Sequence, residues 1–116
     1  MDAYDGYIKA FIKGDTKEVE NYLSFPNYRF LDGEIKKYNE FHSNLNELKN
    51  RGYKATIALN IDVVEISEEK AHLVLKEALR VKDKNEPLEE ISSFYIFIKE
   101  YDKWKIKFSS AFFFPM

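Results

Sequence analysis

The 116-residue sequence predicts an α+β fold in which three N-terminal helices pack on a strongly curved, mainly antiparallel sheet. Two patterns predict it. Apolar residues recur at helical spacing in the first part of the chain, and from Tyr53 onward they alternate with a period of two. Helices followed by a run of strands are typical of α+β proteins. The length suits one core, so we predict a single domain over residues 1–116.

The first two helices are expected to meet at a corner formed by Gly14 and Asp15. Gly14 ends the first helix because glycine adopts the left-handed backbone conformation without a Cβ clash. Asp15 caps the second helix, and Glu18 stands three residues further on, as in a capping box. Pro26 then ends the second helix because it disfavours helical backbone at the preceding residue. Two helices joined so closely can fold back on each other and cover one face of a curved sheet.

A short strand from Tyr28 to Leu31 is predicted next, with a turn at "DG". A third helix is expected from about Ile35 to Asn50, closed by Gly52. Its apolar stripe follows a period of 3.6 residues and consists of Ile35, Tyr38, Phe41, His42, Leu45 and Leu48. Four long strands follow, separated by the turn sequences "SEEK", "DKNEP" and "YDK". They run from Tyr53 to Val63, Ala71 to Val81, Glu90 to Tyr101 and Trp104 to Phe114.

Glu77 interrupts the apolar face of the second long strand. A buried, unpaired carboxylate is costly, so this side chain should pair, titrate or leave the face through a β-bulge. Arg80 lies three residues further on and nominally points to the opposite face. Only a bulge would bring Glu77 and Arg80 together inside the fold.

The last strand is apolar on both faces. Successive strand residues point in opposite directions, so Phe112 and Phe114 face one way and Phe113 the other. One face can pack against the helices, whereas the second requires a cover. We therefore expect a homodimer through the outer sheet face around Phe112, Phe113 and Phe114.

Composition excludes several classes of function. Eighteen Lys and Arg balance 20 Asp and Glu, which disfavours nucleic acid as a partner. The chain has no Cys, and its two His have no ligand spacing, so neither a metal nor a cofactor is expected. The N-terminus lacks a secretory pattern and no apolar run is long enough to span a bilayer. We therefore expect a cytoplasmic protein with no membrane contact.

The whole chain resembles the nuclear transport factor 2-like superfamily, which includes ketosteroid isomerases and polyketide cyclases. The resemblance rests on "YIKAFIKGDTKEVENYL", "FPNYRFLDG", the third helix ending in "RGY", and "SSFYIFIKEYDKWKIKF". It implies a conical sheet whose wide end is closed by three helices, a pocket inside the cone, and an outer sheet face that often forms a homodimer.

The isomerase branch of that superfamily places three polar residues in the pocket. Tyr7 stands seven residues before Gly14, as the branch requires. Counting from the same corner places the general-base Asp at Leu31, so Asp32 is one residue out of step. Where the branch carries a protonated Asp, this chain has Ser93. One match in three argues against steroid isomerase chemistry.

Four residues are candidates for catalysis. Tyr7 could donate a hydrogen bond to a developing oxyanion, and Asp32, His42 or Glu77 could accept a proton. Ser93 and Tyr95 share the strand face that the resemblance assigns to the cavity. The candidate ligand-binding residues are Tyr28, Glu77, Ser93 and Tyr95.

Two functions remain open. The eight Tyr and ten Phe suggest an aromatic-lined pocket for a small, largely apolar molecule, with cofactor-independent acid–base chemistry if the protein is an enzyme. The alternative is a non-catalytic, dimeric interaction module whose cavity is filled by its own rings. The volume of the cavity distinguishes the two.

Overall fold

The computed structural model describes residues 2–31, 33–41, 45–57 and 60–115. Its helices are α1 (Asp2–Lys13), α2 (Thr16–Glu20) and α3 (Leu45–Asn50), with a 3-10 turn, η1, at Asp83–Asn85. Its strands are β1 (Leu23–Leu31), β2 (Glu34–Tyr38), β3 (Ala55–Ile57), β4 (Asn60–Ile66), β5 (Lys70–Val81), β6 (Pro87–Glu100) and β7 (Lys103–Pro115).

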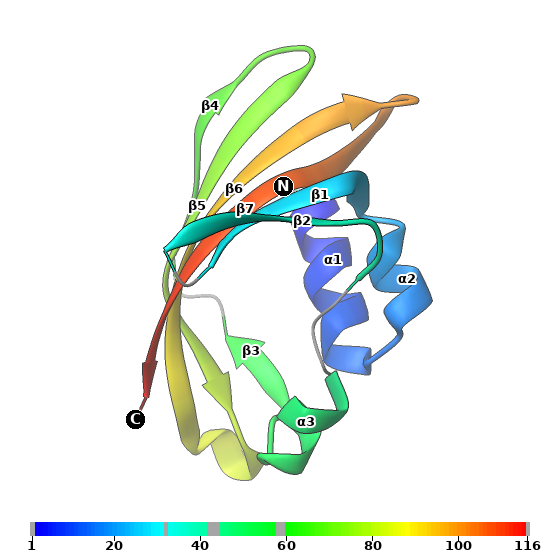
Figure 1. Cartoon of the computed structure of the whole chain (residues 1–116). Coiled ribbons are helices and arrows are strands. Elements are labelled where there is room, and N and C mark those ends of the chain that lie inside the picture. The colour runs from blue at the N-terminus through cyan, green and yellow to red at the C-terminus, as the bar shows by residue number, and fades with distance from the viewer. Residues whose placement is uncertain (1, 32, 42–44, 58–59, 116) are drawn as a thin grey trace.

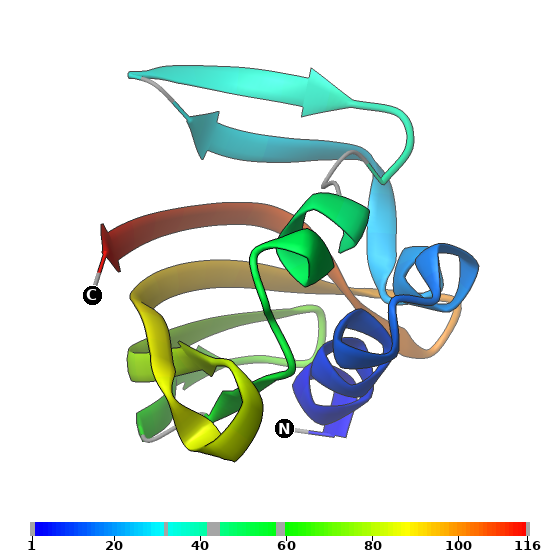
Figure 2. The ribbon, with the colours of Figure 1, turned by 90° about the horizontal axis from the view of Figure 1, so that it is seen from below.

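The strands form one curved, unclosed sheet in the order β2-β1-β7-β6-β5-β3, and β4 pairs with the other half of β5. All pairs are antiparallel except β1 with β7, which run parallel. Helix α1 lies across the concave face, with α2 beside it and α3 near the lower end of β3 (Figure 1). The view from below shows the sheet curving around α1 and leaving β1 and β2 well apart from β5 (Figure 2).

The predicted corner between the first two helices is confirmed. Gly14 has a φ of 77°, and the amides of Gly14 and Asp15 both donate to the carbonyl of Ala10 at 3.1 and 3.2 Å. The Asp15 carboxylate then accepts a hydrogen bond from the amide of Glu18 at 3.1 Å. One glycine thus ends α1 and allows the next residue to start α2.

The prediction of one long third helix was wrong in its first half. Residues 34–38 form strand β2, which pairs with β1 in a hairpin that places Ile35 opposite Phe30. Ile35 is 65% exposed, so the apolar spacing that suggested a helix does not mark a buried face here. Only the last part of the stripe is helical, and it buries Leu45 and Leu48 in α3. His42 lies outside the described residues.

Two strand boundaries also differ from the prediction. Strand β1 begins at Leu23, although the second helix was expected to continue to the residue before Pro26. The register of β1 with β7 shifts between Leu23 and Tyr28. Pro26, which has no amide to donate, lies in this irregular stretch. The strand expected from Tyr53 to Val63 is divided into β3 and β4, which pair with the two halves of β5.

The core lies between α1 and the concave face of the sheet. Tyr4, Ala10 and Phe11 of α1 are buried against inward-facing strand residues. The buried strand residues of this cluster include Leu73, Leu75, Ala78, Phe97 and Ile106. Residues Leu73 and Leu75 alternate as expected, but the next buried position is Ala78, so the alternation is broken between them.

A β-bulge at Lys76 and Glu77 causes this break. Leu75 pairs with Ser93 and Ala78 pairs with Ile91, so two residues of β5 stand opposite one residue of β6. Glu77 is exposed and has a φ of 56°. Of the three outcomes expected for Glu77, the structure shows that its side chain leaves the apolar face through a β-bulge. The shift also turns Arg80 toward the concave face.

Replacing Glu77 with Gly should raise the free energy of unfolding by up to about 1 kcal/mol, because the left-handed backbone is strained for a residue with a Cβ. Glu77→Val is the matched comparison and should destabilise the protein, since a β-branched residue tolerates positive φ poorly. Urea unfolding of the three proteins measures the difference. A more stable Val variant than Gly variant would contradict the assigned bulge geometry.

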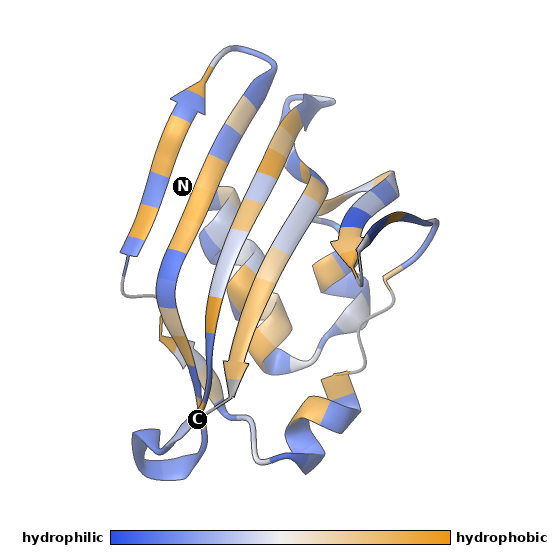
Figure 3. Ribbon diagram, turned by 60° about the vertical axis from the view of Figure 1, so that its left-hand side comes forward, coloured by the Kyte–Doolittle hydropathy of each residue, from blue (hydrophilic) through white to orange (hydrophobic). Residues whose placement is uncertain are grey.

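The outer face of the sheet carries exposed aromatic residues near the C-terminal end of β7. Phe112 and Phe114 are 67% and 47% exposed, and their rings stack with centroids 6.2 Å apart. Figure 3 shows this end of β7 as a continuous hydrophobic stretch of the ribbon. Phe113 points the other way and lines the cavity described below.

Candidate functional site

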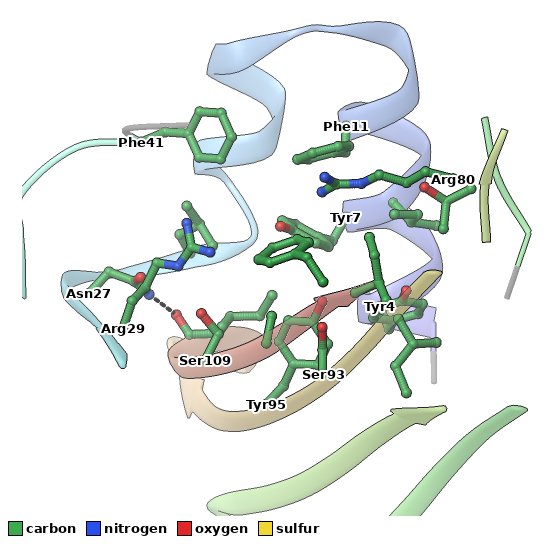
Figure 4. A pocket seen from close by; sticks show the side chains of 18 of the residues that line it. Tyr4, Tyr7, Phe11, Asn27, Arg29, Phe41, Arg80, Ser93, Tyr95 and Ser109 are labelled. Atoms are coloured by element: carbon green, nitrogen blue, oxygen red, sulfur yellow. Dashed lines mark hydrogen bonds between the residues drawn. The ribbon is translucent and has the colours of Figure 1, made fainter. Parts of the chain in front are cut away.

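A cavity of about 70 Å³ lies between α1 and the concave face of the sheet (Figure 4). Its aromatic lining residues are Tyr4, Tyr7, Phe11, Phe41, Tyr95 and Phe113. Its other polar lining residues are Asn27, Arg29, Glu40, Thr56, Arg80, Ser93 and Ser109. Such a mixture of apolar walls and a few convergent polar groups is typical of small-molecule sites.

Three tyrosines form the centre of the lining. Tyr4 and Tyr7 stand three residues apart on α1, so both face the sheet. The ring of Tyr95, from β6, lies 5.7 Å from that of Tyr4 and 6.4 Å from that of Tyr7, measured between centroids. The Tyr7 hydroxyl points into the open space in Figure 4.

Burial raises the pKa of all three hydroxyls above the usual tyrosine value. A hydrogen bond with Ser93 and the charges of Arg29 and Arg80 act in the opposite direction on the pKa of Tyr95. The same two arginines also lower the pKa of Tyr7, against the stronger effect of burial. The tyrosines therefore stay protonated at neutral pH and keep an O–H group that can donate a hydrogen bond.

The Tyr4 hydroxyl is a buried group without a hydrogen-bond partner among the described residues. Tyr4 is only 1% exposed, so bulk water does not compensate for the missing bond. A buried orphan of this kind costs about 1–3 kcal/mol. Tyr4 also lines the cavity, so the group without a partner belongs to the cavity wall.

Arg80 of β5 reaches into the cavity from one wall. Its guanidinium lies 5.4 Å from the ring centroid of Phe11 and 5.3 Å from that of Phe113. Its Nη1 donates to Glu89 Oε1 at 2.8 Å, and Glu89 faces it directly across the β5–β6 ladder. Glu89 is 5% exposed and also lies 3.5 Å from Arg51 Nη2.

Strand β1 supplies the opposite wall. Asn27 and Arg29 are two residues apart, so both side chains reach the cavity. The side-chain Nδ2 of Asn27 donates to the carbonyl of Ile106 at 2.8 Å. Figure 4 shows Arg29 and Arg80 entering from different sides of the space.

The structure brings together some of the residues predicted for the site and separates others. Tyr7, Ser93 and Tyr95 share the cavity, and their functional roles stay predictions. Tyr28 is not part of the lining, because the alternation that turns its neighbours Asn27 and Arg29 inward turns Tyr28 outward, and Lys107 Nζ lies 5.5 Å from its ring centroid.

Three other candidate residues are not found in the described lining. Glu77 does not line the cavity, because the bulge places it in solvent on the outside of β5. Asp32, like His42, lies outside the described residues.

Sequence reasoning missed the two arginines of the lining. Arg80 was assigned to the outer face by strict alternation, although the interruption at Glu77 was the signal that a bulge would reverse its direction. Arg29 lies in a strand whose length and pairing were underestimated. Its place two residues after the buried Asn27 becomes meaningful only when β1 is known to start at Leu23.

Within the described residues there is no group of three or more His, Asp or Glu side chains that could hold a metal ion. In the same part of the chain, no helix is both long enough and apolar enough to cross a membrane.

Comparison with known proteins identifies the fold. No protein-family model and no curated protein sequence matches the chain. Solved structures do match. A nuclear transport factor 2-like protein of unknown function from Shewanella baltica OS155 aligns with a TM-score of 0.62 at 10% identity over 99% of this chain and 90% of that one. A hexachlorocyclohexane dehydrochlorinase, LinA type 2, aligns with a TM-score of 0.64 at 16% identity over 99% and 84%.

The association domain of Caenorhabditis elegans CaMKII aligns with a TM-score of 0.68 at 12% identity over 95% of this chain and 89% of that one. Sequence identities this low carry no information on activity, but the alignments extend over nearly the whole of each chain. The chain therefore has the nuclear transport factor 2-like fold.

Proposed function

We propose that this protein binds a small, largely apolar molecule in the cavity between α1 and the sheet. The observation that carries the proposal is the open cavity itself, which combines aromatic walls with hydroxyl donors and contains the orphan hydroxyl of Tyr4. The open cavity supports this proposal over the alternative, an interaction module whose cavity is filled by its own aromatic rings. Its volume of about 70 Å³ is roughly half that of an engineered 150 Å³ cavity that admits benzene, so it can enclose only part of a ring-sized ligand.

The same arrangement suits acid–base chemistry. Tyr7 and Tyr95 are held protonated by burial and can donate to an oxygen on which negative charge develops. Glu40 is the described carboxylate in the lining and could accept a proton. A dehydrochlorinase is among the solved structures with this fold, which is compatible with such a role. Acid–base chemistry would require that a ligand binds in the cavity, so binding is tested first.

Tyr7→Phe should weaken binding of a ligand such as phenol or benzyl alcohol roughly three- to tenfold, because one hydrogen bond is lost. Calorimetric titration of the purified protein measures this. Tyr101→Phe is the control, since Tyr101 is 91% exposed at the β6–β7 turn and lies outside the cavity. If no compound of this size binds the parent protein, or if both variants behave alike, the proposal is wrong.

We also propose a homodimer through the outer face of the sheet. The stacked, exposed rings of Phe112 and Phe114 support it, and so does the presence of an association domain among proteins with this fold. Light scattering at tens of micromolar should give twice the mass of one chain. A Phe112→Ser, Phe114→Ser double variant should give the mass of a single chain. A parent protein that is monomeric at this concentration would refute the dimer.

A further inference from the structure

The charges that line the cavity are unequal. Among the described lining residues, Arg29 and Arg80 carry positive charge and Glu40 carries negative charge. Glu89, which pairs with Arg80, is not part of the lining and is shared with a second guanidinium, that of Arg51, at 3.5 Å. Two guanidiniums and one carboxylate are therefore the charged groups of the described lining.

The hydrogen bonding of Arg80 leaves one edge of its guanidinium open. Only Nη1 donates within the described residues, to Glu89 at 2.8 Å. The buried Nε has no acceptor among the described residues, although a buried donor without a partner is costly. Nε and Nη2 form the side of an arginine that binds a carboxylate through two parallel hydrogen bonds. Glu89 therefore holds the guanidinium in place while the edge suited to a carboxylate is left for another acceptor.

A second guanidinium and two hydroxyls act on the same space. Arg29 reaches the cavity from β1, across from Arg80 on β5 (Figure 4). Both arginines lower the pKa of Tyr7 and of Tyr95, so both positive charges act at these two hydroxyls. Two cations and two neutral donors converge where a single negatively charged acceptor group would fit.

The walls next to Arg80 are apolar. Phe11 and Phe113 flank its guanidinium, and both line the cavity. A fully hydrated inorganic anion would gain nothing from these rings, whereas a small apolar body attached to an anionic group would contact them. The low polarity of the walls also strengthens a charge-assisted hydrogen bond made inside the cavity.

On this basis we infer that the ligand is a small organic carboxylate, with its carboxylate bound between Arg80 and Arg29 and its apolar body against Phe11 and Phe113. This inference rests on the proposed ligand-binding function and specifies its chemical class. It adds that a carboxylate should be preferred over a neutral compound of the same shape.

The test compares matched probes on the parent protein. Benzoate and benzamide have nearly the same size, as do phenylacetate and phenylacetamide, and only the first of each pair is charged at neutral pH. Calorimetric titration should give at least tenfold tighter binding of each carboxylate, because hydrogen bonds to charged groups are the stronger kind. Inorganic phosphate, which lacks an apolar body, should bind more weakly than benzoate.

Variants then identify the groups that recognise the charge. Arg29→Gln should weaken benzoate binding at least tenfold and leave benzamide binding within about twofold, because it removes charge without touching the Arg80–Glu89 pair. Arg80→Lys should reduce the preference for benzoate as well, since lysine cannot form the two parallel bonds. Arg51→Gln is the control, because Arg51 contacts Glu89 and does not line the cavity. Circular dichroism establishes that each variant is folded.

The outcomes separate the two proposals. Equal binding of benzoate and benzamide would overturn the carboxylate preference and leave ligand binding in place. Tighter binding of benzoate that Arg29→Gln does not change would overturn the assigned position of the carboxylate. If neither neutral nor charged probes bind, the proposed function fails, and the inference fails with it.

Discussion

Replacing Arg80 with Met should lower the free energy of unfolding by about 3 kcal/mol, at the lower end of what breaking a buried ion pair costs. The variant leaves the Glu89 carboxylate, which is 5% exposed, without its 2.8 Å partner. Arg51 remains 3.5 Å away, but it is largely solvated and compensates only in part. Chemical denaturation at neutral pH measures the loss.

Two matched variants identify the cause. Arg51→Met removes the more exposed of the two arginines around Glu89 and should cost less than about 1 kcal/mol. The double variant Arg80→Met, Glu89→Leu should recover at least about 2 kcal/mol of the loss, because apolar residues of similar size replace a buried pair at little cost. A double variant no more stable than Arg80→Met alone would mean that Arg80 acts through packing on Phe11, Tyr53 and Phe113 and not through its charge.

The second large effect is a steep loss of stability in alkaline solution. Burial raises the pKa of Tyr4, Tyr7, Tyr53 and Tyr95 in the folded protein. In the unfolded chain these hydroxyls ionise near the ordinary value, about pH 10. Above that pH the folded state binds more protons than the unfolded state, so the free energy of unfolding falls as pH rises. Below it the four tyrosines are protonated in both states and make no pH-dependent contribution.

Each of these tyrosines should steepen the alkaline decline by up to about 1.4 kcal/mol per pH unit. Tyr4→Phe should remove one such contribution, whereas Tyr101→Phe, at a 91% exposed position, should leave the slope unchanged. Denaturation at a series of alkaline pH values measures the slopes, and tyrosinate absorbance follows the ionisation. Identical slopes for the two variants would show that Tyr4 titrates normally in the folded protein.

Tyr4→Phe has a second expected result at neutral pH. Removing a buried hydroxyl that has no partner among the described residues should leave stability unchanged or raise it by up to about 1 kcal/mol. If the same substitution weakens ligand binding, the Tyr4 hydroxyl contributes to binding of the ligand and not to the stability of the fold. A clear loss of stability would instead mean that the hydroxyl is satisfied in solution by ordered water.

Much of the fold could be read from local sequence. The corner at Gly14 and Asp15 follows from the backbone freedom of one residue and the capping ability of the next, and both act within a few residues. The positions of Tyr7 on a helix, and of Ser93 and Tyr95 on one strand face, follow in the same way from periodicity. These features depend on neighbours along the chain, which is the information that a single sequence carries most directly.

The tertiary structure decided what depends on pairing between distant segments. Apolar spacing from Ile35 to Tyr38 is compatible with a helix, but hydrogen bonds to β1 make this segment a strand. The bulge at Glu77 was foreseen as one of three outcomes, yet only the register of β5 against β6 determines that Glu77 leaves the face and Arg80 enters it. One extra residue in a strand reverses the direction of every side chain after it. The place of Arg80 in the cavity could therefore be assigned only from the folded chain.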